Sequence, residues 1–370
     1  MNREAIVTEL LSWFFRVKRD LPWRSTYDPY HVWVSEIMLQ QTQMERGIRY
    51  FLEWIERFPD LVSVAQAPEQ EILKMWEGLG YYSRARNLHR AAKIMIREHG
   101  GVVPCSSAAL IGLPGIGPYT AAAIASIAGN EDIAAVDANV CRVFSRLFDI
   151  AEPIKTSKAR NRISSLAEEL LPRGRARQFN QALMDLGGLV CTPKIPRCSD
   201  CPLHKECRAC NNGLVQLRPV KSPGVQAKEI HRVVGLIHHD ERIFIQQRGV
   251  GGVWPHLWEF PGTDLQGRRQ KVDEEKVRKL LRRSIFDETG LAVTVHDPVA
   301  SVRHQYTSNR VVLDCYFCSL TRQDHVPVLR SAVNSSWVAP DQLEHYSFPA
   351  GPRKILEQLE NRWTEIITAA

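Results

Sequence analysis

The sequence is poor in long apolar runs, and we expect no segment of it to hold the protein in a membrane or to export it. No apolar run in its 370 residues approaches the roughly 20 residues that cross a bilayer. The segment Met1–Phe15 interrupts its apolar positions with charged residues at helical spacing, which predicts an amphipathic helix rather than a signal peptide. We therefore expect a cytoplasmic protein without a membrane partner.

A concentrated block of charge is also absent. The net charge is +7 and the isoelectric point is about 8.9, but the excess is spread over both halves and forms no basic tail. This mild basicity favours an anionic partner without identifying it, and such a partner would bind a local patch on a folded surface. The composition, 44% hydrophobic and 24% charged, is that of a globular protein, and the length favours two domains.

A glycine-rich segment in the first half predicts two helices joined by a tight turn. One helix would start at Ser106 or Ser107, and an alanine-rich helix would begin at Pro118, because proline suits the first helical position. Gly115 and Gly117 permit the sharp reversal between them. The free N–H groups at the start of the second helix could hold a phosphate, although an ordinary helix connection explains the same glycines.

Two carboxylates stand out in this helical half. Asp137 precedes a predicted helix and is either its N-cap or an anion available for chemistry. Glu36 lies among large apolar residues, where it is either neutralised by a core partner or kept dry with a raised pKa, as a general acid requires near neutral pH. Gln41 and Thr42 follow in a polar cluster that could reach base edges or simply end a helix in solvent.

A second glycine-rich loop, Trp76–Leu88, carries aromatic residues and arginines. Its two glycines are expected to expose Leu79, Tyr81 and Tyr82 on a turn, with Arg84 beside them. Apolar wedges flanked by arginine are what a protein uses to unstack and kink a duplex. The alternative is a loop whose tyrosines pack inward.

Four cysteines are gathered within seventeen residues in the spacing C-x6-C-x2-C-x5-C. In a protein expected in the cytoplasm, such clustering indicates a metal centre rather than disulfides. A zinc site is one interpretation, but zinc-binding cysteines usually form two separated pairs, and one compact loop favours a [4Fe–4S] cluster. Cys210 follows the set and is interpreted as an incidental thiol. The expected ligands are Cys191, Cys198, Cys201 and Cys207.

The hydrophobic pattern changes from helical to alternating in the last third of the chain. Residues 216–229 contain proline and glycine with little apolar patterning, which predicts an interdomain linker. After the linker, Arg232–Arg248 has the pattern of a strand, a turn and a strand, and a helix is expected over Glu274–Asp287. These elements predict an α+β domain over residues 230–366.

In their order along the chain, these motifs resemble the endonuclease III superfamily of helix-hairpin-helix DNA glycosylases, and within it the family of adenine DNA glycosylases. The resemblance spans residues 8–215 and implies an all-α catalytic domain with an iron–sulfur cluster loop in a multidomain protein. The implied catalytic domain is residues 1–215, composed of a six-helix subdomain (26–130) and an iron–sulfur subdomain (1–25 with 131–215). The motifs that carry the resemblance are the Glu36 helix, Gly78–Tyr82, Leu113–Gly117, Val136–Val140 and the cysteine spacing.

The resemblance implies a monofunctional enzyme. Bifunctional relatives place a Schiff-base lysine where this sequence has Tyr119, which cannot form a Schiff base. Glu36 would donate a proton to N7 of a flipped adenine, Asp137 would stabilise the oxocarbenium ion, and Tyr119 and Asn139 would orient Asp137. The competing hypotheses are a glycosylase with lyase activity on oxidised pyrimidines and a non-catalytic DNA-binding module with a redox cluster.

The implied partner is duplex DNA with adenine opposite 8-oxoguanine or guanine, bound by a monomer. The last third resembles a Nudix domain, but Ser284 replaces a glutamate that active Nudix hydrolases require, so no pyrophosphohydrolase activity is expected. The resemblance assigns lesion recognition to Tyr306, Thr307 and Ser308, with Ser308 where histidine is usual. The implied DNA-binding residues are Trp23, Gln41, Thr42, Leu79, Tyr81, Gly115 and Gly117.

Overall fold

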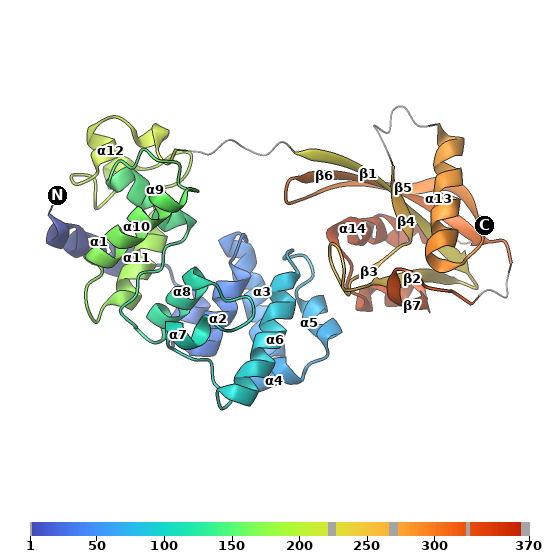
Figure 1. Ribbon diagram of the computed structural model, residues 1–370, viewed down its shortest axis with the longest axis horizontal. Helices are drawn as coiled ribbons and strands as arrows, with labels where there is room; N and C mark the ends of the chain where they lie inside the picture. The colour runs from blue at the N-terminus through green and yellow to red at the C-terminus, as the bar shows by residue number, and fades with distance from the viewer. Residues whose placement is uncertain (1, 221–226, 266–272, 323–325, 364–370) are drawn as a thin grey trace. The chain divides into compact units, whose positions relative to one another are not determined.

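The computed structural model describes residues 2–220, 227–265, 273–322 and 326–363. Two compact units account for the chain, one helical and one built on a β-sheet (Figure 1). The helical unit contains Met1–Ala67 and Arg86–Gly224, and the sheet unit contains Pro68–Ala85 and Val225–Ala370. Part of the predicted linker, residues 221–226, and the predicted end of the second domain at residue 366 lie outside the described residues.

The helical unit confirms the predicted all-α fold. Its first helix, α1 (Arg3–Val17), starts where the Asn2 side chain accepts hydrogen bonds from the backbone N–H groups of Glu4 and Ala5. No described helix of the protein is long and apolar enough to cross a membrane. The other α-helices of this unit are α2 (Pro29–Met38), α3 (Met44–Arg57), α4 (Leu61–Gln66), most of α6 (Ser83–Glu98), α7 (Ser107–Leu110), α8 (Pro118–Ala128), α9 (Ala138–Leu147), α10 (Ser157–Leu170), α11 (Ala176–Leu189) and α12 (Arg208–Asn211).

The alanine-rich helix α8 is buried at the centre of this unit. Its small side chains allow α2, α7 and α11 to pack closely around it. Ala122, Ala123 and Ile127 form a core with Val32 of α2 and with Ala135, which precedes α9. This packing holds the last turn of α2, the first turn of α8 and the start of α9 near one another.

A second core fixes the cysteine loop to the helices. Phe144 of α9 and Phe179 of α11 are fully buried in it, together with residues of α1 and α10. Cys191, Cys201 and Cys207 pack against the same core. The loop that carries the cysteines therefore shares its packing with the helix that begins after Asp137.

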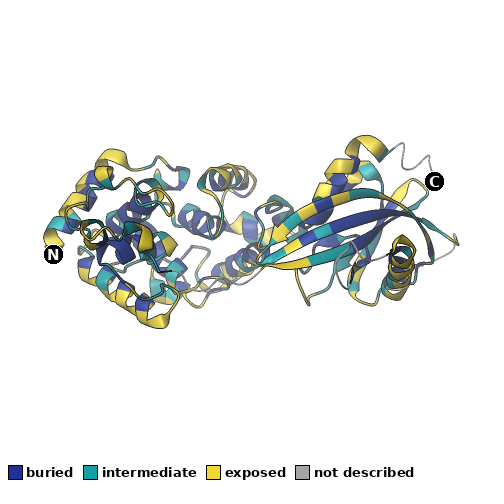
Figure 2. Ribbon diagram, turned by 90° about the horizontal axis from the view of Figure 1, so that it is seen from above, coloured by how far each residue is buried: buried dark blue, intermediate teal, exposed yellow. Residues whose placement is uncertain are grey.

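The sheet unit is a mixed sheet covered by a helix on each face. Its strands follow the order β3-β2-β1-β6-β5, with β4 paired to β1 and β7 paired to β2, and β1 runs parallel to β6. One hydrophobic core lies between the sheet and α13 (Glu274–Thr289), and another between the sheet and α14 (Ala350–Leu359). Figure 2 shows the buried residues along the inner strands. The strands are β1 (Lys228–His239), β2 (Arg242–Arg248), β3 (Trp258–Glu259), β4 (Gly262–Leu265), β5 (Val293–Tyr306), β6 (Asn309–Leu320) and β7 (Ala332–Val338).

The segment 68–85 packs with the sheet unit although it lies within the range predicted for the six-helix subdomain. It contains α5 (Glu69–Met75) and the loop that follows. Glu77 forms an ion pair with Arg353 at 2.6 Å, and the Tyr82 hydroxyl donates a hydrogen bond to the Phe348 carbonyl at 3.1 Å. These contacts join a piece of the first half of the chain to the helix α14 region.

Candidate active site

A cavity of about 490 Å³ opens in the helical unit between α2, α8, α9 and α11. Glu36 comes from the last turn of α2, Tyr119 is the second residue of α8, and Asp137 is the N-cap of α9. The structure therefore brings together three of the predicted catalytic residues that the sequence separates by up to about a hundred positions. The cavity is lined by Arg19, Leu21, Trp23, Arg24, Glu36, Leu39, Gln40, Gln41, Thr42, Met44, Tyr119, Ile127, Asp137, Ala138, Asn139, Gln181 and Met184.

Glu36 is a buried carboxyl group at the wall of this cavity. Burial raises its pKa from 4.5 to about 7, and the nearby negative charge of Asp137 adds to the rise. The Tyr119 hydroxyl, which we expected to orient Asp137, instead donates a hydrogen bond to Glu36 Oε2 at 3.2 Å. This bond and the Arg24 guanidinium oppose the rise in the pKa of Glu36. Near neutral pH a substantial fraction of Glu36 is therefore a neutral acid that can donate a proton.

Asp137 is held by donors on both carboxylate oxygens. Its Oδ1 accepts a hydrogen bond from Val140 N at 2.6 Å, and its Oδ2 accepts one from Asn139 Nδ2 at 2.8 Å. Burial raises the pKa of Asp137 above its usual value. The N–H donors and the positive charge of Arg142 lower it again, and these donors favour the anion.

Asn139 connects Asp137 to the cysteine loop through an arginine. Arg142 donates from Nη2 to Asn139 Oδ1 and to the Gly187 carbonyl, and from Nε to the Cys191 carbonyl, each at 2.8 Å. The helices α9 and α11 approach closely here, since a Cβ at Gly187 would lie 2.7 Å from Asn139 Cβ. Asn139 is therefore positioned both by hydrogen bonds and by the absence of a side chain at Gly187.

Sequence reasoning missed a buried ion-pair group beside the cavity. Asp185 of α11 is fully buried and binds two arginines, with its Oδ2 2.8 Å from Arg24 Nη1 and its Oδ1 2.5 Å from Arg19 Nη2. Both guanidinium groups lower the pKa of Asp185 against the effect of burial. The sequence feature that could have identified Asp185 is a carboxylate among the apolar residues of the segment 179–190.

Gln181 is a second cavity residue that the sequence did not identify. Its amide nitrogen donates to the Arg177 carbonyl at 3.1 Å and to the Tyr27 hydroxyl at 3.5 Å. Its carbonyl oxygen is buried, and within the described part of the chain no donor reaches it. An amide oxygen in this state is available to an N–H group of a ligand.

The turn that follows α2 brings the predicted DNA-binding residues Gln41 and Thr42 to the cavity. Gln41 is exposed and has a φ of +59°, in the left-handed region, whereas Thr42 is half-buried. Gln40, which precedes them, donates from Nε2 to Thr120 Oγ1 at 3.2 Å. Trp23 is buried in the wall, with its ring edge against Phe51.

The turn between α7 and α8 agrees with the predicted hairpin. Ser106 caps α7, and α8 begins at Pro118 as expected. Gly115 has a φ of +77°, and a Cβ there would lie 2.7 Å from Asn87 Cβ, so only glycine fits. Gly117 is the exposed N-cap of α8 and offers no capping side chain, which leaves the first N–H groups of this helix free for an anion.

The loop of residues 76–88 differs from its prediction. Tyr81 is exposed, with a φ of +50°, but Leu79 and Tyr82 are buried, so the expectation that all three are exposed is wrong. The loop curls around Arg84, whose Nη2 donates to the carbonyls of Leu79 at 3.2 Å and Gly80 at 3.0 Å. These bonds turn Leu79 inward.

The three residues assigned to lesion recognition lie at the tip of the β5–β6 hairpin in the sheet unit. Thr307 is exposed with a φ of +49°, while Tyr306 and Ser308 are half-buried. The Tyr306 ring packs against Trp254, with 4.7 Å between ring centroids. The contact between Tyr306 and Trp254 therefore supports the hairpin tip, at which Thr307 is exposed.

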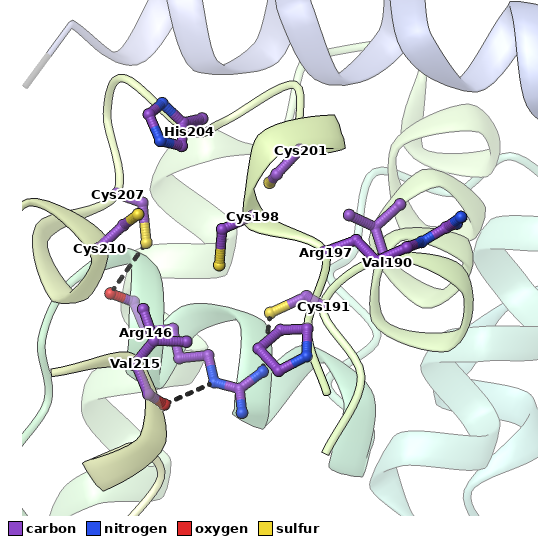
Figure 3. A pocket seen from close by; sticks show the side chains of 11 residues that line it. Arg146, Val190, Cys191, Arg197, Cys198, Cys201, His204, Cys207, Cys210 and Val215 are labelled. Carbon is purple, nitrogen blue, oxygen red and sulfur yellow. Dashed lines mark hydrogen bonds between the residues drawn. The ribbon is translucent and has the colours of Figure 1, made fainter. Parts of the chain in front are cut away.

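The four predicted metal ligands line one pocket in the helical unit (Figure 3). Arg146 donates to Cys191 Sγ at 3.4 Å, and Cys207 Sγ donates to the Arg146 carbonyl at 3.5 Å. No three Cys, His, Asp or Glu side chains converge on a single-ion site among the residues the structure describes. Cys210, interpreted from the sequence as a buried or incidental thiol, also lines this pocket.

Comparisons with known proteins agree with this geometry. A model of the HhH-GPD superfamily base excision DNA repair protein matches residues 34–169, and a NUDIX domain model matches residues 232–358. The adenine DNA glycosylase of Rattus norvegicus is 30% identical over a match that covers 96% of this chain and 78% of the relative. That of Homo sapiens is 44% identical over 54% of this chain and 38% of the relative.

Solved structures resemble the helical part of the chain in fold. A thermostable thymine-DNA glycosylase is 32% identical, with a TM-score of 0.53 over 57% of this chain and 97% of that one. A non-covalent endonuclease III–DNA complex is 22% identical, with a TM-score of 0.50 over 58% of this chain and 99% of that one, and it supports the fold alone. The chain belongs to the adenine DNA glycosylases, monofunctional enzymes of base excision repair.

Proposed function

We propose that Glu36 and Asp137 carry the chemistry of adenine excision in this enzyme. The observation that supports the proposal is a buried Glu36 with a pKa of about 7 in one cavity with an N–H-bound Asp137. Breaking an N-glycosidic bond requires that adenine leave as a neutral base while positive charge gathers at C1′ of the sugar. An acid and an anion across a cavity meet these two needs.

In this mechanism each residue has one task. The Glu36 carboxyl donates its proton to N7 of a flipped adenine, and the Asp137 carboxylate stabilises the positive charge at C1′. The Tyr119 hydroxyl orients Glu36, because burial raises the pKa of Tyr119 well above its usual value and keeps its proton in place as a donor. Asn139 holds Asp137, and the Gln181 carbonyl oxygen accepts a hydrogen bond from the exocyclic amine of adenine.

Single-turnover adenine release tests these roles. Glu36→Gln and Asp137→Asn should each slow release at least about a hundredfold, because each removes one of the two charge-handling groups. Binding to the same duplex in a gel-shift assay should persist. Glu45→Gln, on the exposed start of α3, is the control and should release adenine at the normal rate. Turnover near normal in either cavity variant would refute the mechanism.

We further propose that the adenine lies opposite 8-oxoguanine or guanine, and that the β5–β6 hairpin recognises the lesion. The hydroxyl groups of Thr307 and Ser308 at the hairpin tip support this, since they can bond the atoms that distinguish 8-oxoguanine from guanine. Substituting both by alanine should weaken binding to the lesion duplex by about tenfold and leave binding to the guanine duplex unchanged. Equal losses on both duplexes would count against the assignment.

The four clustered cysteines fit a [4Fe–4S] cluster, which we include in the proposed function. All four thiols line one pocket, and four clustered thiolates are the ligand set that would hold a [4Fe–4S] cluster. When bound, the cluster would hold the loop in one conformation. The exposed basic residues that the loop would then present to phosphates are Lys194, Arg197, Lys205 and Arg208.

A further inference from the structure

The cysteine pocket contains a fifth thiol. Cys210 lies on the one-turn helix α12, three residues after Cys207, and about one helical turn separates these two positions. Its side chain therefore faces the same pocket as the four predicted ligands (Figure 3).

Cys210 lies in the pocket beside two of those ligands. Its thiol is near enough to the thiol of Cys198 to interact with it, and its backbone N–H interacts with the thiol of Cys207. Cys201 has a different set of thiol neighbours, namely Cys191, Cys198 and Cys207. The thiol of Cys210 is thus placed to act at the position of Cys198.

The short helix fixes Cys210 in this position. Asn211 N donates to the Cys207 carbonyl at 3.0 Å, and Gly213 N donates to the Cys210 carbonyl at 3.1 Å. Ala209 is fully buried beside it, and Leu214 N donates to the Ala209 carbonyl at 2.7 Å, which closes the turn. Cys210 is therefore part of an anchored element and does not depend on the cluster for its location.

We propose that Cys210 is a reserve ligand that replaces Cys198 in the cluster site. This inference rests on the proposed [4Fe–4S] cluster. In the replacement, the bond between Cys198 and iron breaks and the departing thiolate takes a proton from water. The Cys210 thiol gives its proton to water and its thiolate binds the open iron, so there is no net release of protons and no electron moves. The site then keeps four thiolates, drawn from a set of five.

Iron and acid-labile sulfide measured in the full-length protein, purified without oxygen, test the proposal. Wild type and Cys210→Ser should contain about four of each per chain. Cys198→Ser should retain more than about half of that iron, while Cys201→Ser and the double variant Cys198→Ser/Cys210→Ser should retain less than about a tenth. Cys105→Ser, far from the pocket in sequence and outside its lining, is the control for loss of a thiol.

The outcomes distinguish a failure of this inference from a failure of the cluster proposal. Wild-type protein without iron would overturn the cluster proposal. The role of Cys210 would be overturned if the wild type contains iron but Cys198→Ser loses iron or its fold to the same extent as Cys201→Ser. Retention of iron in the double variant would also overturn it, and would point to His204, which lines the same pocket. Circular dichroism of each variant reports the fold.

Discussion

Glu36 has to be an acid at a pH where most carboxyl groups are ionised. Burial achieves this by raising its pKa to about 7, and the Tyr119 hydroxyl keeps the carboxyl aimed at the cavity. Asp137 is also buried, but its two oxygens accept N–H donors from Val140 and Asn139, which favour its anion. Two carboxyl groups are thus directed to different roles by their surroundings, because burial favours the neutral acid at Glu36 and N–H donors favour the anion at Asp137.

The rate of adenine release should fall as the pH rises above neutral. Only protonated Glu36 can donate, and with a pKa of about 7 its protonated fraction drops about tenfold for each unit above pH 8. Because the pKa of Glu36 is raised, the protonated, active form is present below about pH 7 and is lost above it. Single-turnover rates measured from about pH 6 to pH 9 check this. A flat profile would contradict it, and the residual rate of Glu36→Gln should be flat in this range.

At the scale of elements, the catalytic anion depends on how closely α9 and α11 pack. Gly187 lets α11 approach Asn139, and Arg142 ties both helices to the Cys191 carbonyl. The next residue, Gly188, is exposed, and a Cβ there would come no nearer than 3.8 Å to the Arg19 guanidinium. A methyl group therefore has room at Gly188 but not at Gly187.

This difference predicts opposite results for two adjacent substitutions. Gly187→Ala places a Cβ 2.7 Å from Asn139 Cβ, which should displace Asp137 and slow adenine release by roughly tenfold to a hundredfold. Gly188→Ala should keep the normal rate and gain up to about 1 kcal/mol of stability, because alanine favours a helix. Single-turnover kinetics and thermal unfolding measure both. Equal rates in the two variants would show that the close approach does not position Asp137.

At the scale of the whole molecule, the sequence predicts those features that depend on residues close together along the chain. The N-cap geometry of Asp137 and the glycine turn at Gly115 follow from residues only a few positions apart. The ion pair of Asp185 with Arg24 joins positions 161 residues apart, which no local pattern reveals. The burial of Leu79 was misjudged for another reason, since the hydrogen bond from Arg84, five residues further on, depends on how the loop folds and not on the residue types alone.

The grouping of residues 68–85 with the sheet unit is the largest feature that local pattern did not predict. Glu77 binds Arg353 and accepts a hydrogen bond from Phe348 N at 3.3 Å, while Trp258 Nε1 donates to Gln70 Oε1 at 3.3 Å. Each of these contacts joins residues more than 180 positions apart. The segment thus takes part of its stability from the sheet unit, although its chain neighbours on both sides belong to the helical unit.

Truncation after Val220 should therefore loosen this segment selectively. The truncated chain keeps the helical unit but loses Arg353, Phe348 and Trp258, so the amides of residues 68–85 should exchange with solvent at least about tenfold faster than in the full chain. The amides of α8 are the internal control and should keep their protection, since α8 packs only among helices of its own unit in the contacts described. Hydrogen exchange followed by mass spectrometry measures both segments in one experiment. Unchanged protection of residues 68–85 would mean that α5 is stabilised by the helical unit, whereas loss of protection in α8 as well would mean that the truncation disturbs the catalytic fold itself.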